Sequence, residues 1–264
     1  MKSFFLDDKF RIDRPGLFGR RVQPHYWTPA DEIASENYAW EWSAKVAPTM
    51  PGGVTTLLDA NGGPITLSTS SNAPTNQPAY LADAGDGAPA LEFTGTTAVQ
   101  KVAYVAPLEI HTETLFYLLR PTQGGTTASS GLFAMGDTTT GFQVDAGLAG
   151  AAQGRIVGSG LFGNAIPAAP VDFTNQWMCG VIELDPAAGQ LRHYVNGSLY
   201  ATGTYNGAAP FSVAHWAVGT NRALGGKVPQ RFAAGFILHS VGPETRARGI
   251  DYLKREWGSR VTGW

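Results

Sequence analysis

The sequence contains a single cysteine, Cys179, so no disulfide can form within the chain. This cysteine lies in the apolar run of residues 177–184, and we interpret it as a small buried hydrophobic residue. Charged residues are scarce as well, at 15% of the chain, and the formal net charge is −2. A chain that binds nucleic acid needs a basic excess or a basic face. We therefore predict no nucleic-acid partner.

Long hydrophobic runs are also missing. No apolar run could span a bilayer, and the apolar residues 4–6 are too short for the core of a signal peptide. We therefore expect no membrane partner. We also expect a protein that is made in the cytoplasm and leaves the cell by another route if it works outside.

Motifs for catalysis and for metal binding are absent. The chain has no G-x-S-x-G elbow, no H-E-x-x-H spacing and no G-x-x-x-x-G-K phosphate loop. Asp83 and Asp86 suggest calcium, because hard cations favour clustered oxygen ligands. The full D-x-D-x-D-G loop pattern is missing, however, and an acidic turn is the simpler interpretation. We predict no metal site and no cofactor.

What the sequence does contain is the signature of a β protein. Glycine is abundant, with 33 residues, and Asn196 and Gly197 separate two short β-rich runs. Both central residues of a type I′ turn need a positive φ, which Asn and Gly tolerate best, so this pair predicts a hairpin. On its first arm Leu191, His193 and Val195 share one face, which can sit on a core.

Other β-rich runs are bounded by Gly, Pro or Asn and predict successive antiparallel strands. They lie at residues 38–42, 99–105, 115–119, 132–135, 142–145, 155–157, 177–184, 214–219 and 232–238. Few charges and many turn residues suit a β-sandwich better than a helical bundle.

Two helices are expected beside the strands. Thr28 precedes Pro29 and acidic residues, as at a helix start, and predicts a short helix to about residue 37. A longer helix should begin at Pro243 and close the fold. Its predicted buried face consists of Ala247, Ile250, Leu253 and Trp257.

The order of these elements resembles the C-terminal half of laminin-G-like domains, which have the concanavalin A-like jelly-roll fold. The matching segments are YVNG at 194–197, WAVGTN at 216–221, the strand at 232–238 and YLKREWG at 252–258; residues 89–95 and 114–121 look like the family's first core strands. The resemblance covers roughly residues 46–258 and implies a mainly β, antiparallel jelly roll, so we predict one such domain over residues 31–264. It leaves function open, because this sandwich hosts lectins, glycosidases, adhesion modules and viral surface proteins.

Glu109 and Glu113 are the nearest approach to a catalytic pair. Concanavalin A-like glycosidases carry two glutamates around an aspartate at alternating strand positions, and His111 stands here in place of that aspartate. The segment also follows Pro107 and looks like a loop. We therefore expect a solvated loop face and no enzymatic activity.

Glycan binding needs less chemistry, namely an exposed aromatic ring and a few polar groups that fix the hydroxyls. The candidate residues lie in the hairpin and the strand after it: His193, Tyr194, Trp216, Asn221 and Arg222. For Trp216 a core position is the alternative, because it alternates with Ala214 and Val218.

Residues 1–30 differ from the rest of the chain. Six basic residues stand against three acidic ones, and aromatic residues are interleaved with prolines, which break any long periodic element. So many aromatic residues need a surface to pack on. We predict an extended attachment arm, whose contact residues are Phe4, Phe5, Phe10, Arg11, Arg14, Phe18, Arg20, Arg21, Tyr26 and Trp27.

A cysteine-poor laminin-G-like domain behind a basic, aromatic arm is similar to structural proteins of tailed bacteriophages. The resemblance implies a virion surface protein, made in the host cytoplasm and displayed as a decoration, fibre or spike. Its partners would be other virion proteins bound through the arm, host-surface glycans bound by the lectin-like domain, and further copies in a homo-oligomer. Two alternatives stay open: a glycosidase or lyase of concanavalin A-like fold, and a bacterial surface adhesion module.

Overall fold

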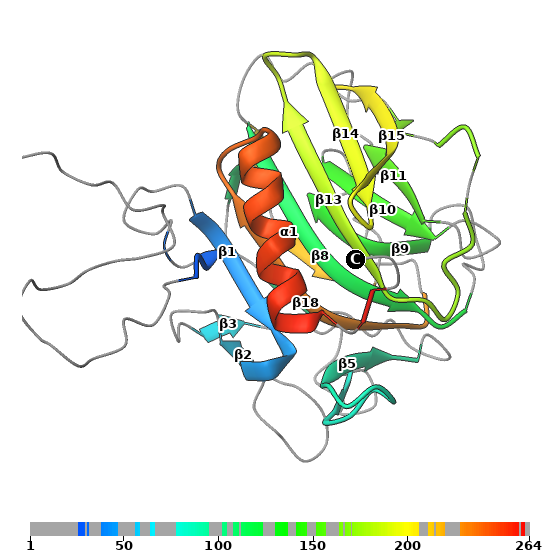
Figure 1. Cartoon of the computed structure of the whole chain (residues 1–264). Coiled ribbons are helices and arrows are strands. Elements are labelled where there is room, and N and C mark those ends of the chain that lie inside the picture. Colours follow the sequence, from blue (N-terminus) through cyan, green and yellow to red (C-terminus); the bar gives the residue numbers. More distant parts are fainter. Residues whose placement is uncertain are drawn as a thin grey trace, which may run out of the picture.

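The computed structural model forms a β-sandwich with one helix packed on its outside (Figure 1). It describes residues 26–29, 31, 38–46, 56–58, 64–66, 78–94, 102–104, 108–110, 112–123, 130–136, 141–146, 152–156, 164–165, 167–169, 171–205, 211–213, 215–219, 228–258 and 260–261. Every strand pair in these ranges is antiparallel. The predicted mainly β, antiparallel sandwich with a C-terminal helix is confirmed.

The larger sheet has eight strands in the order β15-β14-β13-β8-β18-β5-β4, and β1 also pairs with β18. Their bounds are β1 Tyr38–Ser43, β4 Ala79–Leu81, β5 Ala90–Phe93, β8 Glu113–Pro121, β13 Met178–Asp185, β14 Gln190–Val195, β15 Ser198–Thr204 and β18 Gln230–Leu238. β1 and β5 pair with successive halves of the same edge of β18.

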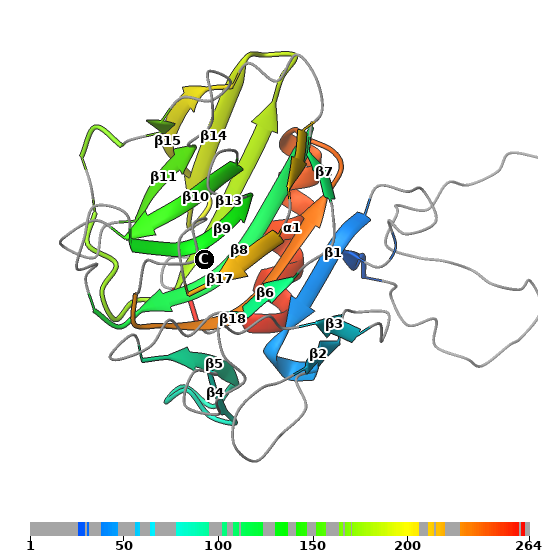
Figure 2. The ribbon, with the colours of Figure 1, turned by 180° about the vertical axis from the view of Figure 1, so that it is seen from behind.

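The second sheet has six strands in the order β12-β11-β10-β9-β17-β6 and faces the viewer in Figure 2. The bounds are β6 Val102–Tyr104, β9 Ser130–Gly136, β10 Gly141–Ala146, β11 Ala152–Ile156, β12 Asn164–Ala165 and β17 His215–Val218. Two small ribbons complete the strands: β2 Thr56–Leu58 with β3 Pro64–Thr66, and β7 Leu108–Ile110 with β16 Phe211–Val213. A 3₁₀ turn, η2, covers Ala44–Val46.

The core lies between the two sheets. Tyr117 of β8 stacks on Phe133 of β9, with ring centres 6.2 Å apart. Gly180 is the register partner of Tyr117 on β13, and a Cβ there would overlap the tyrosine ring. The glycine therefore makes room for the Tyr117 ring, one of the largest fully buried side chains among the described residues.

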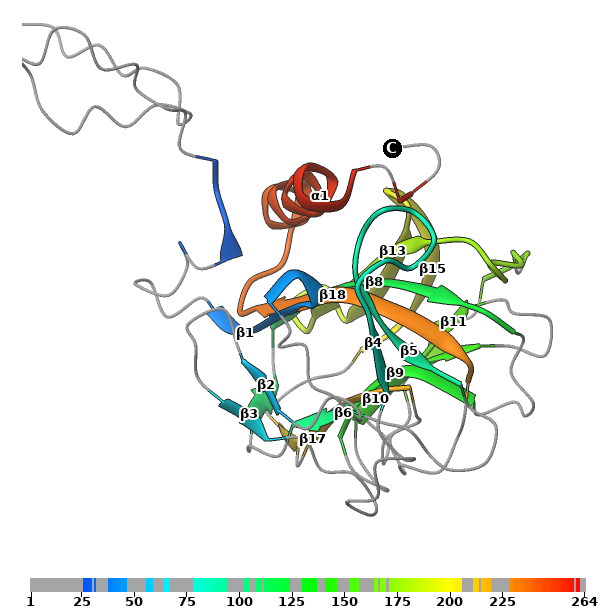
Figure 3. The ribbon, with the colours of Figure 1, turned by 90° about the horizontal axis from the view of Figure 1, so that it is seen from below.

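Helix α1, Pro243–Trp257, covers the other face of the eight-stranded sheet, so the molecule has three layers (Figure 3). Phe116 of β8 stacks on Phe236 of β18 at 4.3 Å, and Gly249 of the helix lies against the Phe116 ring. Both faces of the central strands are thus covered, which explains why β8 and β13 are apolar almost without alternation.

The predicted buried face of this helix is partly wrong. The buried residues are Thr245, Gly249, Leu253 and Trp257, whereas Ala247 is exposed and Ile250 is half-buried. Hydrophobicity identified Leu253 and Trp257 correctly but missed Gly249, because a glycine has no apolar side chain to mark it as a contact residue. Gly249 is what lets the helix backbone approach the ring of Phe116.

The Asn-Gly hairpin is confirmed. Asn196 and Gly197 have φ values of 50° and 82°, and Val195 pairs with Ser198 across the turn. The Asn196 side chain accepts a hydrogen bond of 2.9 Å from the Cys179 backbone N–H, which ties the turn to β13.

Glu113 departs from the expected solvated loop. It begins β8, is only 2% exposed, and lies 3.1 Å from Nδ1 of His239. Glu109 belongs to β7, which pairs with β16 in a separate ribbon. The two glutamates therefore start from different sheets, while His111 lies outside the described residues.

The Asp83 turn has the structure of an acidic turn. One carboxylate oxygen of Asp83 accepts three backbone N–H groups, from Gly85, Asp86 and Gly87, at 2.7–3.0 Å. These hydrogen bonds hold the pKa of Asp83 below its ordinary value. Asp86 instead pairs with the buried Arg260 at 2.7 Å. Within the described ranges, no three His, Cys, Asp or Glu side chains gather into a group that could hold a metal ion.

The short helix expected after Thr28 lies almost wholly outside the described residues. Its first turn is present: Asp31 N–H donates to the Thr28 carbonyl at 3.0 Å, and the Asp31 carboxylate accepts from Thr28 N–H at 2.7 Å. Among the helices in the described part of the chain, none has the length and apolar character needed to cross a bilayer.

Candidate functional site

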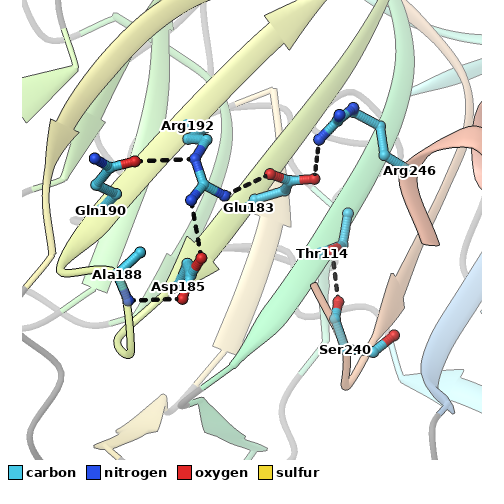
Figure 4. Close-up of polar contacts among 8 residues, drawn as sticks. All are labelled: Thr114, Glu183, Asp185, Ala188, Gln190, Arg192, Ser240 and Arg246. Atoms are coloured by element: carbon cyan, nitrogen blue, oxygen red, sulfur yellow. Dashed lines mark hydrogen bonds and ion pairs between the residues drawn. The ribbon is translucent and has the colours of Figure 1, made fainter. Parts of the chain in front are cut away.

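A dense polar cluster lies between the helix and the eight-stranded sheet, and Figure 4 shows its members. Glu183 is fully buried, and its two carboxylate oxygens bind Arg192 of β14 and Arg246 of α1. Arg192 also binds Asp185 at 2.9 Å and Gln190 at 3.0 Å. Two carboxylates thus face two guanidinium groups, and the charges balance within the cluster. We interpret it as a clamp that fixes α1 to β13 and β14.

Tyr194 and His193, two of the predicted glycan ligands, point to opposite faces of β14. Tyr194 lies on the helix side, where the Arg246 guanidinium covers its ring at 4.1 Å. His193 lies in the core, completely buried. Its Nε2 is 2.6 Å from the Tyr117 hydroxyl, and burial lowers its pKa to about 3. His193 is therefore a core residue, and its inclusion in a surface glycan site was wrong, because strand alternation puts it with Leu191 and Val195.

Trp216 lies in β17 of the other sheet. Its register partner is Met135, and it stands two residues before the buried Val218, so the backbone places it on the same face as Val218. The Trp216 side chain lies outside the described part of the structure, so both interpretations of this residue stay predictions. Asn221 and Arg222 lie outside the described residues and stay predictions. The five predicted ligands are not brought together by the described part of the fold.

Of the predicted contact residues of the arm, only Tyr26 and Trp27 lie in the described residues, and both pack against α1. Trp27 meets Tyr252 edge to face at 6.3 Å, and its carbonyl accepts a hydrogen bond of 2.8 Å from Arg255. Tyr26 is 54% exposed. The other arm residues lie outside the described ranges: Phe4, Phe5, Phe10, Arg11, Arg14, Phe18, Arg20 and Arg21.

A different polar group stands on the outer face of the six-stranded sheet. Val144 of β10 pairs with Phe133, which faces the core, so the neighbouring Gln143 and Asp145 face away from the other sheet. Both are nevertheless buried, with exposures of 4% and 1%. The Gln143 amide donates to both Asp145 oxygens, at 2.8 and 3.1 Å.

The register of the sheet extends this group across neighbouring strands. Arg155 of β11 is the partner of Gln143, Gln153 is the partner of Asp145, and Asn164 of β12 is the partner of Arg155. Directly paired residues share a face of a sheet. We call these five positions the polar row: Gln143, Asp145, Gln153, Arg155 and Asn164.

Small residues continue the same face beyond the polar row. Ala134 of β9 pairs with Gln143, and Ala217 of β17 pairs with Ala134. Gly131 is the partner of Asp145. Gln143 and Asp145 are therefore paired with small residues on the neighbouring strand β9.

The described polar side chains of this face, Gln143 and Asp145, are hydrogen-bonding groups. Amides and carboxylates on rigid strands offer fixed donors and acceptors for hydroxyl groups. Hydrolysis of a glycosidic bond commonly needs two carboxyl groups, one as acid and one as base or nucleophile. Asp145 is the one acidic residue in the strands of this sheet, as far as the structure describes them.

The comparisons with known proteins concern the fold. No family model and no curated protein matches the sequence. Domain 4 of an extracellular arabinanase from Geobacillus stearothermophilus, solved with arabinotriose, superposes with a TM-score of 0.54 and 15% identity, covering 81% of this chain and 98% of that domain. The chain is therefore similar in fold to that domain over almost the whole length of the domain.

Two larger proteins contain a similar fold. The ligand-binding domain of botulinum neurotoxin serotype D, solved with N-acetylneuraminic acid, gives a TM-score of 0.55 at 10% identity and covers 85% of this chain. Trypanosoma rangeli sialidase superposes with a TM-score of 0.53 at 12% identity, and the match covers 89% of this chain. The chain spans only 53% of the toxin domain and 34% of the sialidase, so it is similar to one part of each.

Proposed function

We propose that this protein is a glycan-binding module whose site is the polar row on the outer face of the six-stranded sheet. The observation that carries the proposal is the pair Gln143 and Asp145. Burying a carboxylate and an amide costs free energy unless both are hydrogen-bonded, and these two side chains bond each other on the face turned away from the core.

Two structural neighbours support the ligand class. The arabinanase domain was solved with arabinotriose and the toxin domain with N-acetylneuraminic acid, and both have folds similar to this chain. Within the sandwich folds, we propose the laminin-G-like, concanavalin A-like jelly roll. The order of elements around the YVNG hairpin and the C-terminal helix supports that assignment.

We also propose that the module works without catalysis on the surface of a bacteriophage particle, as a decoration, fibre or spike. The basic and aromatic composition of residues 1–30 supports attachment to other virion proteins. The absence of a second acid in the described strands beside Asp145 supports binding without hydrolysis.

A glycan array probed with the full chain tests the glycan-binding proposal. We expect binding to a defined glycan, and at least a tenfold loss of affinity in Asp145→Asn and in Gln143→Ala, since each removes one member of a hydrogen-bonded pair. Leu199→Ala is the control: Leu199 is 56% exposed on the other sheet, so this change should leave affinity unaltered. Binding to no glycan, or equal affinity of all three variants, would overturn the proposal.

Two further measurements test the proposed lack of catalysis and the proposed place on a virion. Chromatography of the bound glycan after overnight incubation should recover it intact, whereas hydrolysis that Asp145→Asn abolishes would make the protein an enzyme. Peptide mass spectrometry of purified particles from the source should detect this chain among the structural proteins. Its absence from such particles would contradict the virion assignment.

A further inference from the structure

Three guanidinium groups gather on the helix side of the eight-stranded sheet, near the C-terminal end of α1. Arg120 of β8 and Arg231 of β18 are direct register partners, so their side chains share one face. Phe116, four residues before Arg120 in the same strand, lies against the helix, so this shared face is the helix side. Arg260 follows the helix, and its guanidinium carbon lies 4.2 Å from the centre of the Trp177 ring.

Two of the three guanidinium groups are paired with carboxylates. Arg231 donates to Glu92 at 2.9 and 3.0 Å. Arg260, whose side chain is fully buried, donates to Asp86 at 2.7 Å and to two carbonyl groups of the loop between β4 and β5, which reaches this end of α1 (Figure 3). Asp83 in the same loop binds the backbone N–H groups of its own turn. The nearby carboxylates are therefore engaged with other groups.

Arg120 is the group that lacks a partner within the described part of the chain. Its Nε atom is buried and has no hydrogen-bond acceptor there, while Glu92 and Asp86 pair with the other two arginines. Burial lowers the pKa of Arg260, and the nearby positive charge of Arg120 acts in the same direction. Like charges that face each other destabilise a sheet, and a buried donor without an acceptor costs free energy as well. Arg120 is only half-buried, so a small ligand can reach it from solvent.

Two further donors in this place lack an acceptor among the described residues. They are Nε1 of Trp177 and Nε of Arg260, and both atoms are buried. Trp177 directly precedes β13, and the antiparallel register of β13 with β8 carries it to the position opposite Arg120. Indole and guanidinium nitrogens donate hydrogen bonds and do not accept them. The partner that this cluster lacks is therefore a group that only accepts hydrogen bonds and carries negative charge.

We infer that this cluster is a binding site for a small oxyanion, held by Arg120 and lined by Trp177 and Arg260. A guanidinium group binds the oxygens of a phosphate or a carboxylate through two parallel hydrogen bonds. The ligand is thus either a free inorganic anion or the carboxylate of an acidic sugar. The polar row stands on the outer face of the other sheet, with the core between, so the two sites are separate and this one does not rest on the proposed glycan site.

Thermal unfolding in phosphate and in sodium chloride of equal ionic strength tests the role of Arg120. Phosphate stabilises proteins generally, and the variant Arg120→Gln measures that general contribution. We expect the rise in unfolding temperature to be larger in the parent than in Arg120→Gln by about 3 °C or more. Arg120→Lys retains the charge but not the planar fork, so it should lose most of that difference.

Arg248→Gln is the charge-matched control. Arg248 is exposed on α1, and the change also removes one positive charge, so this variant should respond to phosphate as the parent does. In sodium chloride alone, Arg120→Gln should unfold no lower than the parent, since Arg120 has no described partner to lose. Equal rises in the parent and in Arg120→Gln, or a lower unfolding temperature of Arg120→Gln in sodium chloride, would overturn the inference.

Titration followed by the indole N–H resonance of Trp177 identifies the source of the oxyanion. The resonance is assigned by its loss in Trp177→Phe, and the probes are inorganic phosphate, glucuronate and glucose. We expect it to shift with phosphate, with glucuronate or with both, and the probe that saturates the shift at the lower concentration identifies the source. A shift with neither, or an equal shift with glucose, which has no carboxylate, would contradict the site. None of these measurements involves the polar row, so failure of the glycan array leaves this inference to be judged separately.

Discussion

At the scale of single residues, Tyr117 and His193 form a buried hydrogen-bonded pair in the core. Both are fully buried, and burial raises the pKa of the tyrosine and lowers that of the histidine. The phenol therefore keeps its proton and donates a hydrogen bond to Nε2 of a neutral imidazole, 2.6 Å away. Among the described residues, Nδ1 of His193 has no hydrogen-bond partner. A protonated ring would have to be accommodated in an apolar interior.

We predict that His193 makes the protein less stable in acid. Burial lowers its pKa from 6.5 to about 3 in the folded state, so between these values the unfolded chain binds more protons than the folded chain. The free energy of unfolding is independent of His193 titration above about pH 6.5. Below that pH it falls by about 1.4 kcal/mol for each pH unit, down to about pH 3. Urea unfolding at pH 7, 6, 5 and 4 measures this slope.

The control for the acid prediction is a pair of glutamine variants. His193→Gln retains an acceptor for Tyr117 and cannot titrate, so it should flatten the slope. His239→Gln changes a histidine whose side chain is 32% exposed, and it should retain the slope. Equal slopes in the parent and in His193→Gln would show that another group governs acid stability.

At the scale of the elements, the β14–β15 hairpin depends on backbone conformation at its turn. Gly197 has a φ of 82°, and a Cβ there would meet nothing within 4 Å, so space is not the constraint. We predict that Gly197→Val lowers the free energy of unfolding by about 1 kcal/mol or more, because a β-branched residue is strained at positive φ. Chemical denaturation measures the loss. Ser198→Val, one residue later in extended β15, should cost much less; an equal loss in both would point to side-chain packing instead.

The α1 layer depends on the close approach at Gly249. In an exposed helix, Gly→Ala stabilises by about 1 kcal/mol. Here a Cβ would overlap the Phe116 ring, and we predict that Gly249→Ala destabilises the fold by about 1–3 kcal/mol instead. Adding Phe116→Leu to the alanine variant should recover part of that loss, since it removes the ring edge. Thermal unfolding that shows stabilisation by Gly249→Ala alone would mean that the helix has room to move outward.

At the scale of the whole molecule, the arm and the sandwich meet at Tyr26 and Trp27. We predict that a chain beginning at residue 26 unfolds at the same temperature as the full chain. A chain beginning at residue 31 should still fold but unfold roughly 3–8 °C lower, because it loses the contacts of Trp27 with Tyr252 and Arg255. Circular dichroism on heating compares the three chains. A fragment 31–264 without β structure would contradict the domain boundary at residue 30.

The sequence by itself determined the elements that depend on local chemistry. Asn196 and Gly197 fixed the hairpin because few other residue pairs tolerate two positive φ values. The apolar runs at 177–184 and 232–238 became β13 and β18, and Pro243 began the helix. Each of these signals acts within a few residues, so it can be recognised without knowing what packs against it.

Only the tertiary structure decided which faces are buried and which polar residues come together. His193 and Tyr194 are neighbours in the chain, but the pleat sends one into the core and the other toward Arg246. Gln143 and Arg155 are placed opposite each other by the register of β10 and β11, and no local pattern marks them as a pair. A strand has two faces, and its sequence cannot tell which one a second sheet or a helix will cover, because that depends on the layer that residues far along the chain supply.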